Sequence, residues 1–342
     1  MVLLQEVIAQ ARKGYENARV HAGVLVSALL FSSLAALQGC AGLVPQTSAL
    51  LEGLPEGLPP SVELTGVPFF PQLENECGPA SLATVLTAAG ASTTPEALVP
   101  EVYLPARKGS LQVEMLAATR RHGLVSYQLE PSFVDVMREV ASGTPVVVLQ
   151  NLGGFWDEWH YAVVVGYDYP FGQLVLRSGI TEREQMPFGV SEFVWKRGGY
   201  WAMVATPPDR IPVTAREDKW LNSLVAFERL NDPRSNRTAY GAFLKRWPDN
   251  VNAAVGLANA HYALGELPQA EQVLRAALAR APDSSIVLNN LAQTLSDQGR
   301  DREALSYIEK AASKALPDGG PYADAVRETR DGILKKLAAK KN

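Results

Sequence analysis

The spacing of apolar positions divides the chain into three parts. Residues 23–37 form an uninterrupted apolar run of 15 residues, the region from 67 to 206 alternates short apolar runs with amphipathic segments, and the region after Pro207-Pro208 carries Ala, Leu, Gln and Glu at helical spacing. A run of 15 residues is shorter than the about 20 that a membrane-spanning helix needs. The pattern therefore predicts an N-terminal targeting segment, a mixed α/β domain and an all-helical region, which agrees with about two domains for 342 residues.

Cys77 lies at a predicted helix start inside the mixed region. It is followed by Gly-Pro and then by helix-forming residues 80–89, and Gly90 ends the segment. Proline is favoured in the first turn of a helix and glycine just after its end. Cys77 is therefore expected at a helix N-terminus, where main-chain N–H groups favour a thiolate and lower the pKa of the thiol.

A cysteine nucleophile needs a base, and His160 is the histidine in the best position to supply it. It opens the run His-Tyr-Ala-Val-Val-Val-Gly, which predicts a buried strand. His122 precedes Gly123 at a predicted helix end, and His261 falls in the helical region, so we expect packing roles for both. Trp156 and Trp159 precede the strand; they fit the lining of a substrate cleft and packing at the strand start equally well.

These residues carry a resemblance to a known family. Gln72 five positions before Cys77, the Cys-Gly-Pro start, and His-Tyr-Ala-Val-Val-Val-Gly-Tyr downstream are similar to the bacteriocin-processing (double-glycine) cysteine peptidase family of the papain-like clan, over residues 67–206. The resemblance implies Cys77 as nucleophile and His160 as general base. It also implies that the Gln72 amide and the Cys77 N–H stabilise the oxyanion.

The third member of the implied triad differs from the family. The family's Asp-Pro pair corresponds to about Arg177-Ser178-Gly179 in this sequence. Asp168 would lie roughly 25 Å along the strand from His160, which is too far for contact. Counting back from the turn at 168–172 sets Ser178 opposite His160, so Ser178 is the expected orienting residue, without a negative charge.

The helical region contains an internal repeat. The segment from Leu257 to Ala270 recurs 34 residues later as Leu291 to Ala304. This resembles tetratricopeptide repeats at 251–284 and 285–318, with a degenerate unit at 217–250 and a capping helix at 321–340, together a domain at 217–342. Such arrays imply a protein or peptide partner in the concave groove.

The N-terminus resembles a bacterial lipoprotein signal. Positive residues precede the apolar run, and Leu37-Gln38-Gly39-Cys40 follows it; Gln38 departs from the usual small residue. The resemblance implies a signal peptide at 1–39, lipidation of Cys40, and outer-membrane attachment facing the periplasm, because Ala41 rather than Asp follows. The Pro- and Gly-rich residues 40–66 are expected to form a tether without a core. An uncleaved membrane anchor and a plain secreted protein are the alternatives.

Composition narrows the function classes. Net charge is −4 and the pI is about 5.7, without a basic cluster for nucleic acid. No nucleotide motif, metal site or cofactor is expected, and two cysteines do not form a disulfide framework. The predicted fold class is an α+β papain-like cysteine peptidase domain followed by an all-α tetratricopeptide-repeat solenoid. The expected function is a lipid-anchored peptidase whose repeats recruit a partner or substrate. A weak or inactive peptidase-fold scaffold and a thioacyl transpeptidase are the alternatives.

Overall fold

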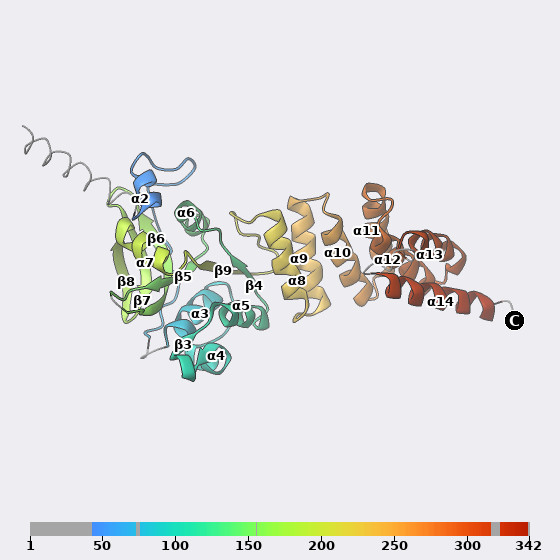
Figure 1. Cartoon of the computed structure of the whole chain (residues 1–342), viewed down its shortest axis with the longest axis horizontal. Coiled ribbons are helices and arrows are strands. Elements are labelled where there is room, and N and C mark those ends of the chain that lie inside the picture. The colour runs from blue at the N-terminus through green and yellow to red at the C-terminus, as the bar shows by residue number, and fades with distance from the viewer. Residues whose placement is uncertain (1–42, 73–75, 155, 316–321, 341–342) are drawn as a thin grey trace, which may run out of the picture.

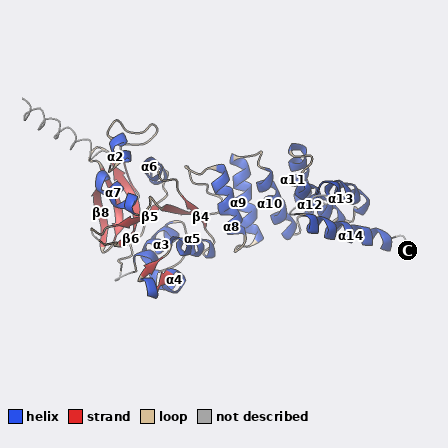
Figure 2. Cartoon of the chain, viewed as in Figure 1, coloured by secondary structure: helices blue, strands red, loops and turns tan. Residues whose placement is uncertain are grey.

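The structure, a computed structural model, describes residues 43–72, 76–154, 156–315 and 322–340. A mixed α/β domain comes first in the chain and a row of helices follows it (Figures 1 and 2). The predicted fold class is confirmed. Within the described ranges, no helix has both the length and the apolar character needed to cross a membrane.

The first domain is built on one mainly antiparallel sheet. Its strands run in the order β4-β9-β5-β6-β7-β8, and β1 pairs with the C-terminal half of β6. Their bounds are β1 (Ser61–Glu63), β4 (Val125–Gln128), β5 (Val146–Asn151), β6 (Trp159–Asp168), β7 (Gln173–Ser178), β8 (Thr181–Pro187) and β9 (Ala202–Thr206). A separate two-stranded hairpin of β2 (Tyr103–Leu104) and β3 (Gly109–Ser110) surrounds the short 3-10 helix η1 (Pro105–Arg107).

Helices cover both faces of the sheet, so its central strands are apolar on both sides. Alternate residues of β6 point to opposite faces: Val163 and Val165 pack against one set of helices, whereas Ala162 and Val164 pack against the other. The first set comprises α3 (Cys77–Ala88), α4 (Pro95–Val102) and α5 (Gln112–Arg121). The second comprises α2 (Pro45–Leu50), α6 (Phe133–Ala141) and α7 (Phe188–Arg197).

Residues 43–66 do not form the expected tether. The main-chain N–H groups of Gln46 and Thr47, at the start of α2, donate to the buried carboxylate of Glu192 on α7, at 2.9 and 2.5 Å. Leu50 is buried, and β1 extends the sheet. The prediction was wrong because it weighed the Pro and Gly content of this segment and overlooked its few apolar residues, which are enough to pack one turn of helix and one strand. The expected signal peptide and Cys40 lie outside the described residues.

The second region consists of antiparallel helix pairs. These are α8 (Glu217–Glu228) with α9 (Pro233–Arg246), α10 (Val251–Ala263) with α11 (Leu267–Arg280), and α12 (Ser285–Asp297) with α13 (Asp301–Ala315), followed by α14 (Ala323–Ala339). Close approach between pairs requires small residues: a Cβ at Gly256 would lie 2.4 Å from the ring of Tyr240. His261 bonds through Nδ1 to Glu266 at 2.6 Å, which is a packing role within the repeat.

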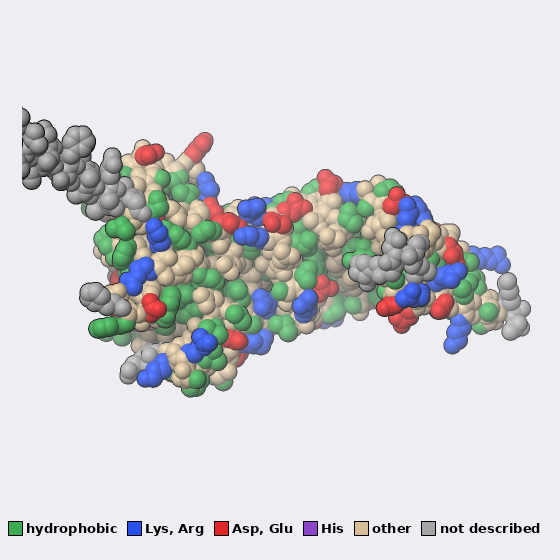
Figure 3. Space-filling model, in the orientation of Figure 1, with side chains coloured by type: hydrophobic (Ala, Val, Ile, Leu, Met, Phe, Trp, Pro, Cys, Tyr) green, Lys and Arg blue, Asp and Glu red, His purple; other side chains and the backbone are tan. Residues whose placement is uncertain are grey.

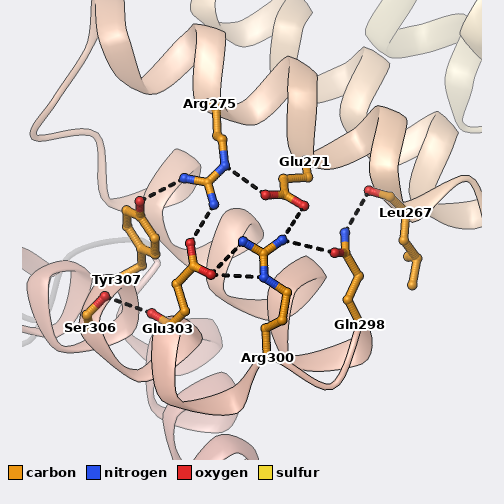
Figure 4. Close-up of polar contacts among 8 residues, drawn as sticks. All are labelled: Leu267, Glu271, Arg275, Gln298, Arg300, Glu303, Ser306 and Tyr307. Carbon is orange, nitrogen blue, oxygen red and sulfur yellow. Dashed lines mark hydrogen bonds and ion pairs between the residues drawn. The ribbon is translucent and has the colours of Figure 1, made fainter.

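A charged network also ties neighbouring repeats together (Figure 4). Arg275 and Glu271 on α11 both reach across to the next helix pair, where Arg300 and Glu303 complete a closed ring of ion pairs at 2.5–2.8 Å. Tyr307 accepts a further bond from Arg275 at 2.9 Å. A closed network holds each side chain through more than one partner, so it orders the stack better than isolated surface pairs do.

The two regions share one hydrophobic core. Trp220 of α8 is fully buried and meets Tyr127 of β4 edge-to-face, with ring centroids 5.7 Å apart. The Tyr127 hydroxyl accepts the Arg216 main-chain N–H at 3.1 Å. On the linker between the regions, Thr214 donates twice to the buried carboxylate of Glu139. The helical region therefore packs directly on the edge of the sheet.

Candidate active site

The sulfur of Cys77 lies where α3 meets strand β6. Cys77 is the first residue of α3, as predicted. The helix ends just before Gly90, which adopts the left-handed conformation (φ +97°). The main-chain N–H groups of Tyr161, Gly78 and Cys77 face the Cys77 thiol closely enough to lower its pKa. The sulfur therefore rests against the peptide group that joins His160 to Tyr161.

Sheet geometry explains why the main-chain N–H of Tyr161 can face the Cys77 thiol. Its partner across β5 is Leu149, whose N–H points the other way, to the carbonyl of Trp201 at 3.0 Å. Tyr161 therefore directs its own N–H and carbonyl away from β5, beyond the point where pairing with β7 ends at Val163. Cys77 takes the N–H, and the Ser81 hydroxyl donates to the carbonyl at 3.1 Å.

Gln72 lies beside the same strand position. Its side-chain amide donates to the Tyr161 carbonyl at 3.3 Å, and its main-chain N–H donates to Gly179 at 3.0 Å. Cys77 and Gln72 thus meet at one residue of β6, although they approach from different segments. A glutamine amide carries two N–H donors, so one remains for another acceptor.

His160 is half-buried, and its ring bonds to Ser178. Its Nε2 lies 3.0 Å from Oγ of Ser178. Among the residues that the structure describes, the Cys77 thiol and the His160 imidazole share no hydrogen bond. Catalytic hydrogen bonds are often absent or long in unliganded enzymes and form when the substrate binds.

The register that brings Ser178 to His160 differs from the expected one. A β-bulge between Val164 and Gly166 shifts the pairing, and Val163 lies opposite Arg177. Ser178 is therefore not directly opposite His160; it reaches the ring diagonally, from the same face of the sheet. The expectation was wrong because the hairpin pairs Asp168 with Gln173, a register that by itself would set Ser178 opposite Val163; the bulge then moves Ser178 one residue nearer to His160.

Burial favours the neutral forms of Cys77 and His160. Burial raises the pKa of the Cys77 thiol above its ordinary value, and the three N–H groups oppose this only in part. Burial lowers the pKa of His160, against the opposing charges of Glu184 and Glu158. Both directions favour a neutral thiol beside a neutral imidazole. The lowered thiol pKa expected from the helix N-terminus is thus outweighed by desolvation.

A cleft of about 650 Å³ opens at Cys77. One wall is the loop 107–112, which brings Arg107, Lys108 and Ser110; the other includes Asp157, Glu158 and Trp159. Trp159 therefore lines the cleft, which was one of the two roles predicted for it. Trp156 is exposed on the adjoining loop. The two walls carry opposite charges.

The loop 107–112 is the part of the site that sequence reasoning missed. Ser110 packs so closely on the helix start that a Cβ at Gly78 would lie 2.2 Å from its Oγ, and its carbonyl accepts from the Tyr161 hydroxyl at 3.2 Å. Lys108 adopts a left-handed conformation (φ +48°), which is uncommon for a residue other than glycine. Gly78 was the sequence signal that could have revealed this loop, because a glycine at a helix start can mark the close approach of another segment.

The first domain is a mixed α/β peptidase-like domain with a cysteine at the start of α3 and a histidine on β6, the strand that this helix contacts, and helical repeats follow it. Residues 64–186 match the family model described as the peptidase C39-like family, and residues 225–285 and 260–323 match tetratricopeptide repeats. The chain thus carries a C39-like peptidase domain and tetratricopeptide repeats. No curated protein is detectably similar to the chain in sequence.

Solved structures resemble each half. A C39-like peptidase from Bacillus anthracis is 18% identical and covers 43% of this chain and 97% of its own, with a TM-score of 0.36. The peptidase domain of Streptococcus ComA is 19% identical, covering 41% and 98%, with a TM-score of 0.35. The Sgt2 repeat domain from Aspergillus fumigatus is 20% identical, covering 37% and 82%, with a TM-score of 0.34. The family models, rather than these partial superpositions, identify the two halves.

Proposed function

We propose that the chain is a cysteine peptidase in which Cys77 attacks peptide carbonyl groups and His160 acts as its base. The observation that carries this proposal is the position of the Cys77 sulfur. It lies at a helix N-terminus and in a cleft, against the peptide group that follows His160. A cysteine that served only packing would not need three main-chain donors and an open cleft.

The reaction begins from the neutral pair. His160 takes the thiol proton through Nδ1, since Nε2 is held by Ser178, and the sulfur attacks the substrate carbonyl carbon. The oxyanion accepts hydrogen bonds from the Cys77 N–H and from the second N–H of the Gln72 amide. Imidazolium then protonates the leaving amine. Water, deprotonated by His160, releases the acid product from the thioester and restores the thiol.

The helical repeats supply a second binding surface. A hollow of about 140 Å³ lies between α10 and α12, lined by Asn259, Tyr262, Asn290 and Gln293. Amide side chains offer both donors and acceptors, which suits a polypeptide main chain. We propose that this groove recruits the substrate or a protein partner to the peptidase domain.

A second function is favoured by one specific observation. His160 is oriented by the neutral Ser178 and, among the described residues, shares no hydrogen bond with Cys77. This arrangement suits a peptidase fold kept as a binding scaffold, with little catalysis. A thioacyl transpeptidase is the third possibility: an amine in place of water takes the acyl group from the thioester and releases the thiol, and every step up to the thioester is shared.

We further propose that the chain is a bacterial lipoprotein, lipidated at Cys40 and held at the outer membrane facing the periplasm. The sequence Leu37-Gln38-Gly39-Cys40 after an apolar run supports this. Replacement of Cys40 by serine is expected to move the protein from the membrane fraction to the soluble fraction. Unchanged membrane fractionation would instead support an uncleaved anchor at residues 23–37.

A peptide-directed electrophile tests the peptidase itself. A peptidyl acyloxymethyl ketone should label wild-type protein at Cys77, and His160→Ala should slow labelling strongly while a small thiol reagent still reaches the sulfur. Equal labelling of wild type and His160→Ala would support the scaffold. His122→Ala is the matched control, because His122 bonds to Glu101 at a helix end away from the cleft.

A further inference from the structure

Large apolar side chains are exposed at the end of the peptidase domain where the described chain begins. We call this the α7 surface; it comprises Leu43, Leu51, Phe171, Val190 and Phe193, which are 53, 81, 79, 50 and 40% exposed. Figure 3 shows hydrophobic side chains spread over this end of the molecule. Single exposed apolar residues are ordinary, but a group around one helix marks an interaction surface.

Hydrogen bonds between the elements bring the segments that carry these residues together. Val190 and Phe193 lie three positions apart on one side of α7, and Lys196 of the same helix donates to the Leu43 carbonyl at 3.3 Å. The turn that carries Phe171 meets the start of α7, where the Phe188 N–H donates to Gly172 at 2.8 Å. Leu51 directly follows α2. The end of α2 lies beside the same turn, because the Tyr169 hydroxyl donates to the Leu50 carbonyl at 2.7 Å.

The position of Leu43 against α7 is fixed by buried polar bonds. Glu192 is fully buried and accepts the first N–H groups of α2, and the Gln46 side chain accepts the Phe133 N–H at 2.6 Å. The chain thus enters the peptidase domain at one defined point, beside the exposed face of α7.

That entry point is close in sequence to both candidate anchors. Cys40 precedes Leu43 by three residues, a reach of at most about 10 Å at full extension. The apolar run ends at Leu37, six residues before Leu43, a reach of at most about 20 Å. A lipid on Cys40 and an uncleaved apolar helix would both hold Leu43 near the bilayer surface, and α7 with it.

Basic and aromatic residues border the apolar side chains. The guanidinium of Arg197 lies 5.8 Å from the Phe193 ring centroid and also donates to the Gly153 carbonyl. That contact connects α7 to the loop carrying Trp156, which is 76% exposed. Tryptophan is enriched at the membrane–water interface, and lysine and arginine beside apolar residues are attracted to anionic lipid headgroups.

We propose that the α7 surface is a membrane-contact surface that holds the peptidase domain against an anionic lipid bilayer in one orientation. This proposal rests on the membrane anchor proposed above. The loop after Gly153 continues directly into the cleft wall at Asp157, Glu158 and Trp159. The cleft therefore opens beside the bilayer, and its substrates are polypeptide segments that lie at the membrane surface.

The test measures contact between side chains and lipid. Full-length protein with Phe193→Cys in a Cys77→Ser background carries a bimane label and is reconstituted in phosphatidylethanolamine–phosphatidylglycerol vesicles with a doxyl-labelled lipid. The matched control is Val225→Cys on α8, which is also 40% exposed. The Cys77→Ser parent, without either new cysteine, measures any label on Cys40.

Emission from position 193 is expected to fall by about half, because interfacial apolar groups enter the bilayer by about 5–10 Å, whereas emission from position 225 stays unchanged. Equal emission from the two positions would overturn the proposal and would leave a protein partner as the occupant of this face. The Cys40→Ser variant separates the two hypotheses. If quenching at position 193 persists in Cys40→Ser, the α7 surface binds the bilayer without the lipid anchor. If the protein with Cys40 intact binds the vesicles but position 193 is not quenched, the proposed α7 surface is refuted and the proposed anchor is not.

Discussion

The imidazole of His160 is oriented by the hydroxyl of Ser178, with Nε2 and Oγ 3.0 Å apart. A hydroxyl fixes the direction of the ring as a carboxylate would, but it brings no negative charge to stabilise the imidazolium that forms during catalysis. The arrangement leaves Nδ1 as the nitrogen that can take the thiol proton. In the proposed mechanism, this arrangement makes His160 a weaker base than a histidine oriented by a carboxylate.

Substitution at Ser178 tests this directly. Ser178→Ala should lower kcat/KM by about tenfold, since orientation is lost but no charge is removed. Ser178→Asp should raise the pKa of His160 and increase kcat, because a carboxylate stabilises the imidazolium. Kinetics with a cleaved peptide and NMR titration of the His160 ring are the measurements. An unchanged kcat/KM in a correctly folded Ser178→Ala protein would show that the contact has no role in catalysis.

The reactivity of Cys77 should depend on pH as a buried thiol does. Burial raises the pKa of Cys77, so the thiol is protonated at pH 7 and thiolate appears only as pH rises above the ordinary range. The rate of iodoacetamide alkylation is therefore expected to rise through pH 9 without a plateau near neutrality. A plateau below pH 7 that disappears in His160→Ala would reveal a preformed thiolate–imidazolium pair and contradict the neutral pair.

Glu184 is expected to influence His160 from β8, two strands away in the sheet. Burial lowers the pKa of His160, and the Glu184 carboxylate opposes this more than Glu158 does. Glu184→Gln should therefore lower the pKa of His160 further. Since the base must be neutral, the acid limb of the kcat/KM profile should move to lower pH. Glu96→Gln on α4 serves as the control; an acid limb that moves equally in both variants would exclude the role of Glu184.

The sequence predicted the main elements of the peptidase domain because local signals agreed there. Cys77 preceded a helix with a proline in its first turn and a glycine after its end, and the β-branched run after His160 required a buried strand. What failed depended on distant partners. Burial of Cys77 outweighs the helix N-terminus only because α3 packs on β6, and α2 is ordered by Glu192, about 145 residues further along the chain. The register of the β6–β7 hairpin, which pairs Asp168 with Gln173, was also not evident from the local sequence.

The shared core between the two regions predicts a large effect at Trp220. Trp220→Ala removes a fully buried ring from its contact with Tyr127 and should lower the free energy of unfolding by about 3–5 kcal/mol. Chemical denaturation followed by far-UV circular dichroism measures this. Leu230→Ala is the control, since Leu230 is exposed, and should change stability by less than about 0.5 kcal/mol. Equal stability of the two variants would mean that the regions fold independently of this contact.

Cleavage of a complex peptide mixture tests the central claim most directly. Wild-type protein and Cys77→Ala are incubated with the mixture, and new peptide termini are quantified by mass spectrometry. We predict new termini with wild type and none with Cys77→Ala, because the Cys77 sulfur forms the acyl-enzyme in the proposed mechanism. The same set of termini from both proteins would contradict the proposed peptidase activity. So would the absence of new termini with wild-type protein whose Cys77 reacts with the peptidyl ketone.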